Sequence, residues 1–199
     1  MQKASQLTMK NQTCILLVDL ECTCDNEPPL PPEEAETIEL GAIVGSLTQK
    51  SFVQLDERQL YVKPFHHRKL TLFCTELTGI TQEQVDKASL LPGVLDKFKD
   101  WLSNYELAAW GSWGNFDAWQ LRMETGRKEI ANPLQYLPHI NVKQIFADNK
   151  GHRVNLAKAI KLSGLTFSGR LHSGIDDTRN IAQLLENDIA LRTSFLNQI

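Results

Sequence analysis

The chain is organised around the segment Cys14-Ile15-Leu16-Leu17-Val18-Asp19-Leu20-Glu21, in which five apolar residues lead into two carboxylates. The apolar run is aliphatic and too short for a helix, so it predicts a buried β-strand. Because residues two apart on a strand point to the same side, Asp19 and Glu21 project together while Leu20 turns into the core. Two buried carboxylates repel each other unless a cation lies between them, and a hard divalent cation, Mg²⁺ or Mn²⁺, suits oxygen ligands. The alternative is a strand that ends at a solvated acidic turn.

The composition of the chain is that of a soluble globular protein: 199 residues, 42% of them hydrophobic and 23% charged. We expect a flexible N-terminus over residues 1–12 and a single domain over 13–199. No stretch reaches membrane-spanning length and the first ten residues lack the apolar centre of a signal peptide, so the expectation is a cytoplasmic protein with no membrane partner. The four cysteines have no zinc-site spacing and are expected to be reduced thiols.

The net charge of −3 argues mildly against a general polyanion binder. A local basic patch can still guide a phosphate backbone, and the segment from Lys63 to Lys69 is the candidate. A solvated loop after a strand explains this patch as well as a contact surface does.

The first half of the chain predicts three strands. The first leads into an exposed loop with four prolines at Pro28, Pro29, Pro31 and Pro32, which exclude helix and central strand. Alternating or apolar patterns then predict strands at Thr37–Val44 and Gln59–Pro64. Short connections between the strands indicate an antiparallel meander.

The second half predicts mainly helices. Thr81 with Gln84 has the pattern of a capping box. Helical patterns follow at Pro92–Leu102, Asn115–Met123, Val142–Ala147, Asn155–Leu162 and Asp176–Glu186, with a short buried strand at Leu107–Trp110. Together these patterns predict an α/β three-layer domain with a mixed, roughly five-stranded sheet flanked by helices.

Further acidic residues lie at helix starts in the second half. Asp117 follows a strand and a glycine-rich turn, at the start of a predicted helix. An acidic residue at this position can also serve only the helix, because it interacts favourably with the helix dipole. His172 lies in a loop with glycines before a helix that bears Asp176 and Asp177. Both acids can have a purely structural role, with Asp176 as the expected N-cap and Asp177 in the first turn of the helix. His172 can equally be a loop residue without a functional role.

Taken in order, Asp19-x-Glu21, Asp117 and His172-x4-Asp177 resemble the motifs of the DEDDh 3′–5′ exonucleases, which have a ribonuclease H-like fold. The resemblance is to the Eri-type branch, with its histone-mRNA 3′-end exonucleases and bacterial KapD-like relatives, and spans about residues 12–186. The segments that carry it are Val18–Asp25, Thr37–Ala42, Phe73–Thr81, Ser112–Asp117 and His172–Ala182.

The resemblance implies Asp19, Glu21, Asp117 and Asp177 as ligands of two divalent metal ions, Mg²⁺ or Mn²⁺, and His172 as the general base. Two such ions about 4 Å apart support in-line attack of water on a phosphodiester. A histidine side chain can accept and donate a proton near neutral pH, which suits a general base.

The resemblance also implies a binding site for the last nucleotide. Its expected members are Thr23, Leu77, Thr78, Gly79 and Ile80, of which Leu77 and Ile80 would stack on the terminal base and Thr23 would contact the terminal sugar. Ordinary packing of a turn explains these residues equally well.

The expected activity is thus metal-dependent 3′–5′ hydrolysis at the 3′ end of single-stranded nucleic acid, with RNA favoured over DNA. Within the enzymes, the alternative is an exonuclease for short oligonucleotides or DNA. From another class, the alternative is a regulatory or binding protein that uses the fold without catalysis, as the inhibitor role attached to KapD-like names implies; a protein partner is conceivable but no motif points to one.

Overall fold

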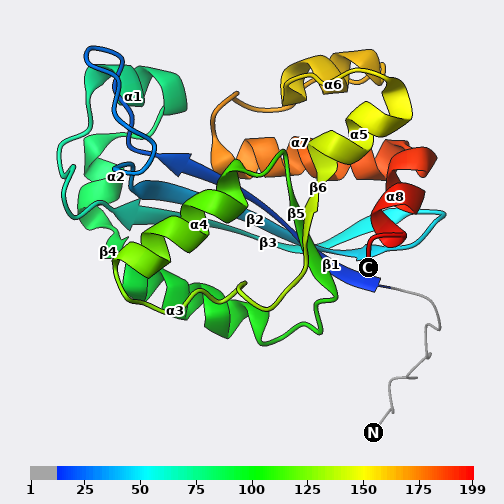
Figure 1. The fold of residues 1–199 in the computed structure, drawn as a ribbon, viewed down its shortest axis with the longest axis horizontal. Helices are drawn as coiled ribbons and strands as arrows, with labels where there is room; N and C mark the ends of the chain where they lie inside the picture. The colour runs from blue at the N-terminus through cyan, green and yellow to red at the C-terminus, as the bar shows by residue number, and fades with distance from the viewer. Residues whose placement is uncertain (1–12) are drawn as a thin grey trace, which may run out of the picture.

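The computed structural model describes residues 13–199, which form a six-stranded sheet in the order β4-β3-β2-β1-β5-β6 (Figure 1). The strands are β1 Thr13–Cys22, β2 Thr37–Leu47, β3 Phe52–Lys63, β4 Ser89–Leu90, β5 Ala109–Ser112 and β6 His139–Asn141. Strands β1, β2 and β3 are antiparallel neighbours, whereas β5 pairs with β1 in parallel and β6 with β5 in parallel. The predicted meander and mixed sheet are confirmed.

Helices cover both faces of this sheet (Figure 1). They are α1 Leu72–Thr78, α2 Gln82–Lys87, α3 Leu91–Leu102, α4 Phe116–Arg127, α5 Val142–Lys150, α6 Leu156–Leu162, α7 Gly174–Asn187 and α8 Ile189–Leu196. The alternation of β1 explains the three layers: Ile15 and Leu17 pack with residues of α5 to α8, whereas Leu16 and Val18 pack with residues of α3 and α4. Asp19 and Glu21 share the face of Ile15 and Leu17, so they point toward the layer that contains α7.

The elements differ from the predictions mainly at their ends and in the shortest segments. The third strand begins at Phe52 instead of Gln59, because its exposed first half gives no apolar signal. Two short strands, β4 and β6, raise the strand number to six from the expected five or so, and two or three residues are too few for a visible period. Helices α1 and α8 were not predicted, while the capping box of Thr81 and Gln84 is confirmed.

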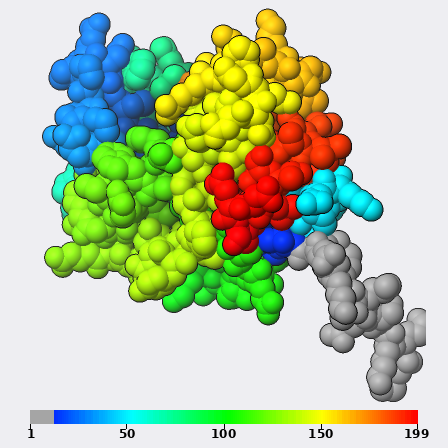
Figure 2. Space-filling view, turned by 45° about the vertical axis from the view of Figure 1, so that its right-hand side comes forward, coloured from blue at the N-terminus to red at the C-terminus, as the bar shows by residue number. Residues whose placement is uncertain are grey.

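Helix α8 closes the end of the sheet that lies away from Asp19 and Glu21. Arg192 is 3% exposed and donates to the carbonyls of Gln49 and Lys50 at 3.2 and 3.0 Å. Figure 2 shows this C-terminal segment beside the β2–β3 turn. The predicted flexible segment 1–12 lies outside the described residues. Within residues 13–199, no helix has the length and apolar character needed to cross a bilayer.

Candidate active site

Strand β1 presents the first two acids where its neighbour β5 has ended. The parallel pairing with β5 stops at Leu17, which lies opposite Gly111. Asp19 and Glu21 therefore lie on the part of β1 that extends past β5, and β2 alone continues beside them. Glu21 is only 9% exposed and Asp19 is half-buried. Glu21 is thus largely shielded from bulk water and Asp19 is shielded in part.

Asp117 is tied to β1 by a backbone contact. It lies in the first turn of α4, is 5% exposed, and its Oδ1 accepts the backbone N–H of Leu20 at 2.9 Å. Leu20 stands between Asp19 and Glu21, so this hydrogen bond places the third acid against the other two. A residue 97 positions away along the chain is brought to the same point by the turn after β5.

Helix α7 supplies the fourth acid and starts earlier than predicted. Its N-cap is Ser173 and its first residue is Gly174, so both Asp176 and Asp177 lie in the first turn. The prediction of Asp176 as N-cap is wrong. The carboxylate of Asp176 instead accepts the backbone N–H of Arg170 and the guanidinium of Arg179, each at 2.9 Å, which fixes the loop before the helix.

Two glycines let α7 rest directly on the sheet. A Cβ on Gly41 would lie 2.2 Å from the carbonyl carbon of Gly174, and one on Gly174 would lie 3.0 Å from the backbone oxygen of Asp19. No side chain fits between the helix start and strands β1 and β2. This contact sets the position of Asp177 relative to Asp19.

Glu39 on β2 holds the same helix start, and sequence reasoning missed it. Its carboxylate accepts the backbone N–H groups of Gly174 and Ile175, both at 3.1 Å, and its side chain is almost wholly buried. Glu39 lies directly opposite Glu21 in the β1–β2 register. The available signal was an acid in an otherwise buried strand, which requires a donor partner in a folded protein.

His172 lies at the open rim of this cluster. It is exposed and has a φ of +60°, an uncommon left-handed conformation that turns the loop toward the sheet. One ligand atom from each of Glu21, His172 and Asp177 can be chosen so that all lie within 4.8 Å of one another. The structure thus brings together the histidine and the four predicted acids, Asp19 and Asp117 through the β1 contacts above.

The cluster is electrostatically unfavourable without cations. Burial, reinforced by Asp177, raises the pKa of Glu21 to about 9, and burial raises the pKa of Asp177 to about 7. The pKa of Asp19 is well above its usual value because of burial and then the nearby charges of Asp117 and Glu21. Burial also raises the pKa of Asp117, against the lowering effect of its Leu20 hydrogen bond. Four carboxyl groups that are all hard to ionise at one point favour a positive partner.

The donor set fits a hard divalent cation. The four acids supply carboxylate oxygens, which are the ligands that Mg²⁺ and Mn²⁺ prefer. Asp177 Oδ1 is buried and has no hydrogen-bond partner among the described residues, although buried carboxylate oxygens are normally satisfied. A cation in contact with this oxygen would satisfy it and lower the repulsion among the acids.

The residues predicted to hold the last nucleotide have mixed surroundings. Thr78 and Ile80 are each 2% exposed, and Ile80 packs in a small apolar cluster with Cys74, so core packing accounts for both. Thr23 is 5% exposed and its hydroxyl accepts the N–H of Glu36 at 3.0 Å. Their role in substrate binding stays a prediction.

Leu77 and Gly79 are the members of this set that are only half-buried. Gly79 ends α1 with a φ of +76°, and a Cβ there would lie 2.7 Å from Arg170 Nε. Glycine at this position therefore lets Arg170 cross the end of α1, where its guanidinium donates to the carbonyl of Glu76. Arg170 belongs to the loop that carries His172, so α1 and this loop are in contact.

Comparison with known proteins gives consistent matches along the chain. Residues 16–185 match the family model described as Exonuclease (RNase_T). The chain is 33% identical over 205 residues to the 3′-5′ exonuclease Snipper of Drosophila melanogaster, with 92% of this chain and 72% of that protein covered. It is 32% identical over 199 residues to human 3′-5′ exoribonuclease 1, with 92% of this chain covered but only 54% of that protein.

A solved structure has the same fold. The nuclease domain of 3′hExo, described as a DEDDh family member bound to rAMP, superposes with a TM-score of 0.78 at 30% sequence identity. The match covers 96% of this chain and 94% of that domain. The predicted ribonuclease H-like architecture is confirmed.

Proposed function

Because this chain belongs to the exonuclease family, we propose that it is a metal-dependent 3′–5′ exonuclease of the DEDDh type, acting on the 3′ end of single-stranded nucleic acid. The observation that carries the proposal is the convergence of Asp19, Glu21, Asp117 and Asp177 at the end of β1, with His172 at its open rim. RNA is the proposed preference over DNA, supported by relatives named exoribonucleases.

Divalent cations are used by this family, and here the ions are proposed to be two Mg²⁺ or Mn²⁺ held by the four carboxylates. When bound, such ions stabilise the negative charge that develops on the phosphoryl group and make water more acidic. Glu39 and Leu20 then act as supports, because they fix the start of α7 and the carboxylate of Asp117. Calorimetric titration with Mn²⁺ in the presence of a nucleoside monophosphate should show two ions per chain, and a single ion would contradict this count.

His172 is proposed to accept the proton of the attacking water. A side chain at the exposed rim can approach a substrate that enters from solvent, and imidazole is a common general base near neutral pH. Ligand atoms of His172, Glu21 and Asp177 lie within 4.8 Å of one another, which supports this role beside the acids proposed to hold the ions. The proton thus leaves toward solvent while the acids remain with the cations.

The test uses 5′-labelled RNA and DNA oligomers of one sequence, incubated with Mg²⁺ or Mn²⁺ and resolved on a gel. We expect a ladder that shortens from the 3′ end, faster on RNA, and absent with EDTA or in Asp19→Ala. Asp96→Ala is the matched control, because Asp96 is exposed on α3, away from the cluster. Intact substrate in every lane with active-site geometry unchanged would overturn the proposal in favour of a binding role for this fold.

A further inference from the structure

The loop of residues 64–71 between β3 and α1 is held in a fixed shape by one buried carboxylate. Glu36 has a side chain with no exposed surface, and it accepts the backbone N–H groups of Phe65, His66 and His67 at 3.1, 2.7 and 2.9 Å. Lys128 pairs with the same carboxylate at 2.8 Å. The amides of Phe65, His66 and His67 are therefore used internally, and the side chains of Phe65, His66, Arg68 and Lys69 are exposed.

Those outward side chains are basic and aromatic. Phe65 is 49% exposed, and the guanidinium of Arg68 lies 5.5 Å from the centre of its ring while Arg68 Nε donates to the carbonyl of Phe65 at 3.0 Å. His66 meets the ring of Phe65 edge-on, with ring centres 4.9 Å apart. Lys69 is exposed, and within residues 13–199 its ammonium has no hydrogen-bond or ion-pair partner. The loop thus presents a stacking surface and uncommitted positive charge.

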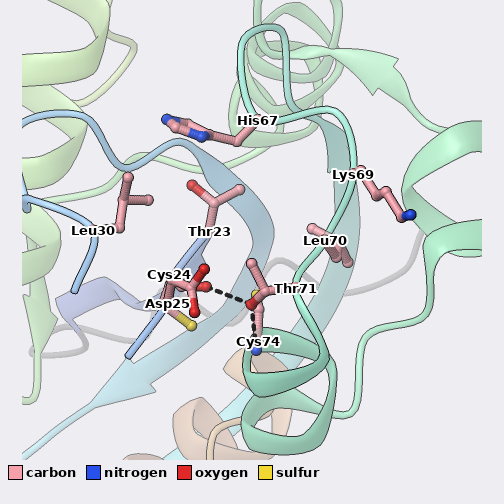
Figure 3. A pocket seen from close by; sticks show the side chains of 9 residues that line it. All are labelled: Thr23, Cys24, Asp25, Leu30, His67, Lys69, Leu70, Thr71 and Cys74. Atoms are coloured by element: carbon pink, nitrogen blue, oxygen red, sulfur yellow. Dashed lines mark hydrogen bonds between the residues drawn. The ribbon is translucent and has the colours of Figure 1, made fainter. Parts of the chain in front are cut away.

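The loop shares a cavity with a residue that closely follows the first two acids in the chain. His67 and Lys69 line a cavity of about 60 Å³ together with Thr23 and Leu30, and Thr23 follows the metal-site residue Glu21 by two positions. In Figure 3 the ring of His67 lies on the side of Leu30 and Thr23, whereas Lys69 extends away from the cavity. A ligand that leaves the acids past Thr23 therefore meets the loop, with Arg68 and Lys69 beyond.

Among the described residues that line this cavity, one is acidic and offsets part of the positive charge of Lys69. Asp25 is a further lining residue, and its carboxylate is engaged by the N–H of Asn26 at 2.8 Å. The whole chain has a net charge of −3, so a cluster of cations on one loop is a local feature rather than a general one. Cations with an exposed aromatic ring beside them match a single strand, whose phosphates pair with the charge and whose bases stack.

We propose that the Phe65–Lys69 loop binds the part of a single-stranded nucleic acid that lies upstream of the 3′-terminal nucleotide. Arg68 and Lys69 contact its phosphates and Phe65 stacks on one of its bases. The inference rests on the proposed exonuclease function, since it assigns the path of the substrate away from the acids. It predicts that affinity increases with oligomer length until the strand reaches the loop.

The experiment compares wild type with Phe65→Ala and with the double variant Arg68→Gln/Lys69→Gln. The matched control is Lys50→Gln, because Lys50 is an exposed lysine in the β2–β3 turn at the other end of the sheet. KM is measured on RNA oligomers from two to twelve nucleotides, and binding of a labelled twelve-nucleotide RNA is followed by fluorescence anisotropy in EDTA over a range of salt concentrations.

The two kinds of variant have different expected signatures. Loss of two phosphate contacts should reduce the slope of log K against log salt by about 1.4, at ~0.7 per contact on a single strand. Phe65→Ala should weaken binding about tenfold with an unchanged salt slope, since stacking is not ionic. In both, the fall of KM with oligomer length should largely disappear, while Lys50→Gln behaves as wild type.

Failure of this inference differs from failure of the proposed function. If wild type degrades RNA and the loop variants keep the wild-type length dependence and salt slope, the loop assignment is overturned and the exonuclease stands. If wild type degrades nothing, the anisotropy data alone decide: weaker binding in the loop variants than in Lys50→Gln supports the loop as a strand-binding surface, and equal binding overturns it.

Discussion

Replacing Gly41 with alanine tests whether the close contact between β2 and α7 sets the geometry of the acids. An ideal Cβ at this position lies 2.2 Å from the carbonyl carbon of Gly174 and 2.3 Å from the nitrogen of Ile175. Carbon atoms prefer a separation of about 3.5–4.0 Å, so the new methyl is more than about 1 Å too close. Its neighbours are backbone atoms, and relief requires the helix and strand to separate.

The expected cost follows from this displacement. Overpacking of a well-packed site typically lowers the free energy of unfolding by about 1–3 kcal/mol. For a domain of this size, a loss of about 2 kcal/mol corresponds to a fall in Tm of roughly 4–8 °C. A shift of about 1 Å between Asp177 and Asp19 should also reduce kcat by about 100-fold, because misplacement of this size is costly in active sites.

Thermal unfolding and nucleotide release on a labelled RNA oligomer measure the two effects. Gly126→Ala is the matched control, because nothing lies within 4 Å of a Cβ at this position in α4, and alanine should leave Tm unchanged or raise it slightly. If Gly41→Ala melts within a degree of wild type and keeps its activity, the argument that this contact positions α7 is refuted.

Three further predictions address the acids and their partners. His172→Ala should lower kcat by about 10²–10⁴ in the nucleotide-release assay with little change in Tm, since it removes only the general base; a loss below tenfold would contradict that role. Glu39→Gln leaves one of the first two amides of α7 without its acceptor and should lower kcat about tenfold or more. Gln59→Ala removes a donor to Glu39 and to the Tyr61 hydroxyl but leaves both α7 amides bonded to Glu39, so it should behave as wild type in the same assay. In EDTA, the raised pKa values of Asp177 and Glu21, about 7 and about 9, mean that the folded state holds protons more tightly than the unfolded state. The free energy of unfolding should therefore fall as pH rises from about 5 to about 9, and added Mg²⁺ should raise Tm more at high pH than at low pH. A metal-free Tm that does not change over this pH range in scanning calorimetry would contradict the raised pKa values of these acids.

The sequence predicts the position of the first two acids because a strand has a fixed period. Once Cys14 to Val18 is read as a buried strand, Asp19 and Glu21 must share a face, and the structure places them so. The antiparallel pairing of β2 with β3 follows in the same way from their short connection at residues 48–51, whereas β1 and β2 pair across the longer segment 23–36. Local rules were sufficient where the period or the connection length decides the outcome.

The support of α7 was not predictable from local patterns. The role of Glu39 depends on the register that sets it opposite Glu21 and on the contact between Gly41 and Gly174, which are 133 positions apart in the sequence. The first residue of α7 could not be predicted from local patterns either. Asp176 has the residue type of an N-cap, yet the close approach of Gly174 to the sheet begins the helix three residues earlier.

The segment around α1 shows how two readings of one motif can divide between its residues. Thr78 and Ile80 are buried, whereas Leu77 and Gly79 are half-buried. Leu77 and Thr78 lie in the last turn of α1, where successive residues point to different sides, and Ile80 enters the apolar cluster after Gly79 has ended the helix with a left-handed φ of +76°. The sequence left packing and substrate contact equally open for the whole segment. The burial of each residue in the folded chain separates the two explanations.

The arrangement of the acids links the stability of this protein to its proposed chemistry. Asp19, Glu21, Asp117 and Asp177 are held by a strand, a backbone hydrogen bond and a helix start, and each has a raised pKa. These contacts fix the oxygens in place but supply no positive charge, so in the absence of cations the acids keep protons or repel one another, and the apolar core on both faces of the sheet must offset that cost. A cation that binds between them recovers that energy on binding. The same rigidity that makes the empty cluster costly therefore makes it a strong and well-oriented site for the ions that phosphodiester hydrolysis requires.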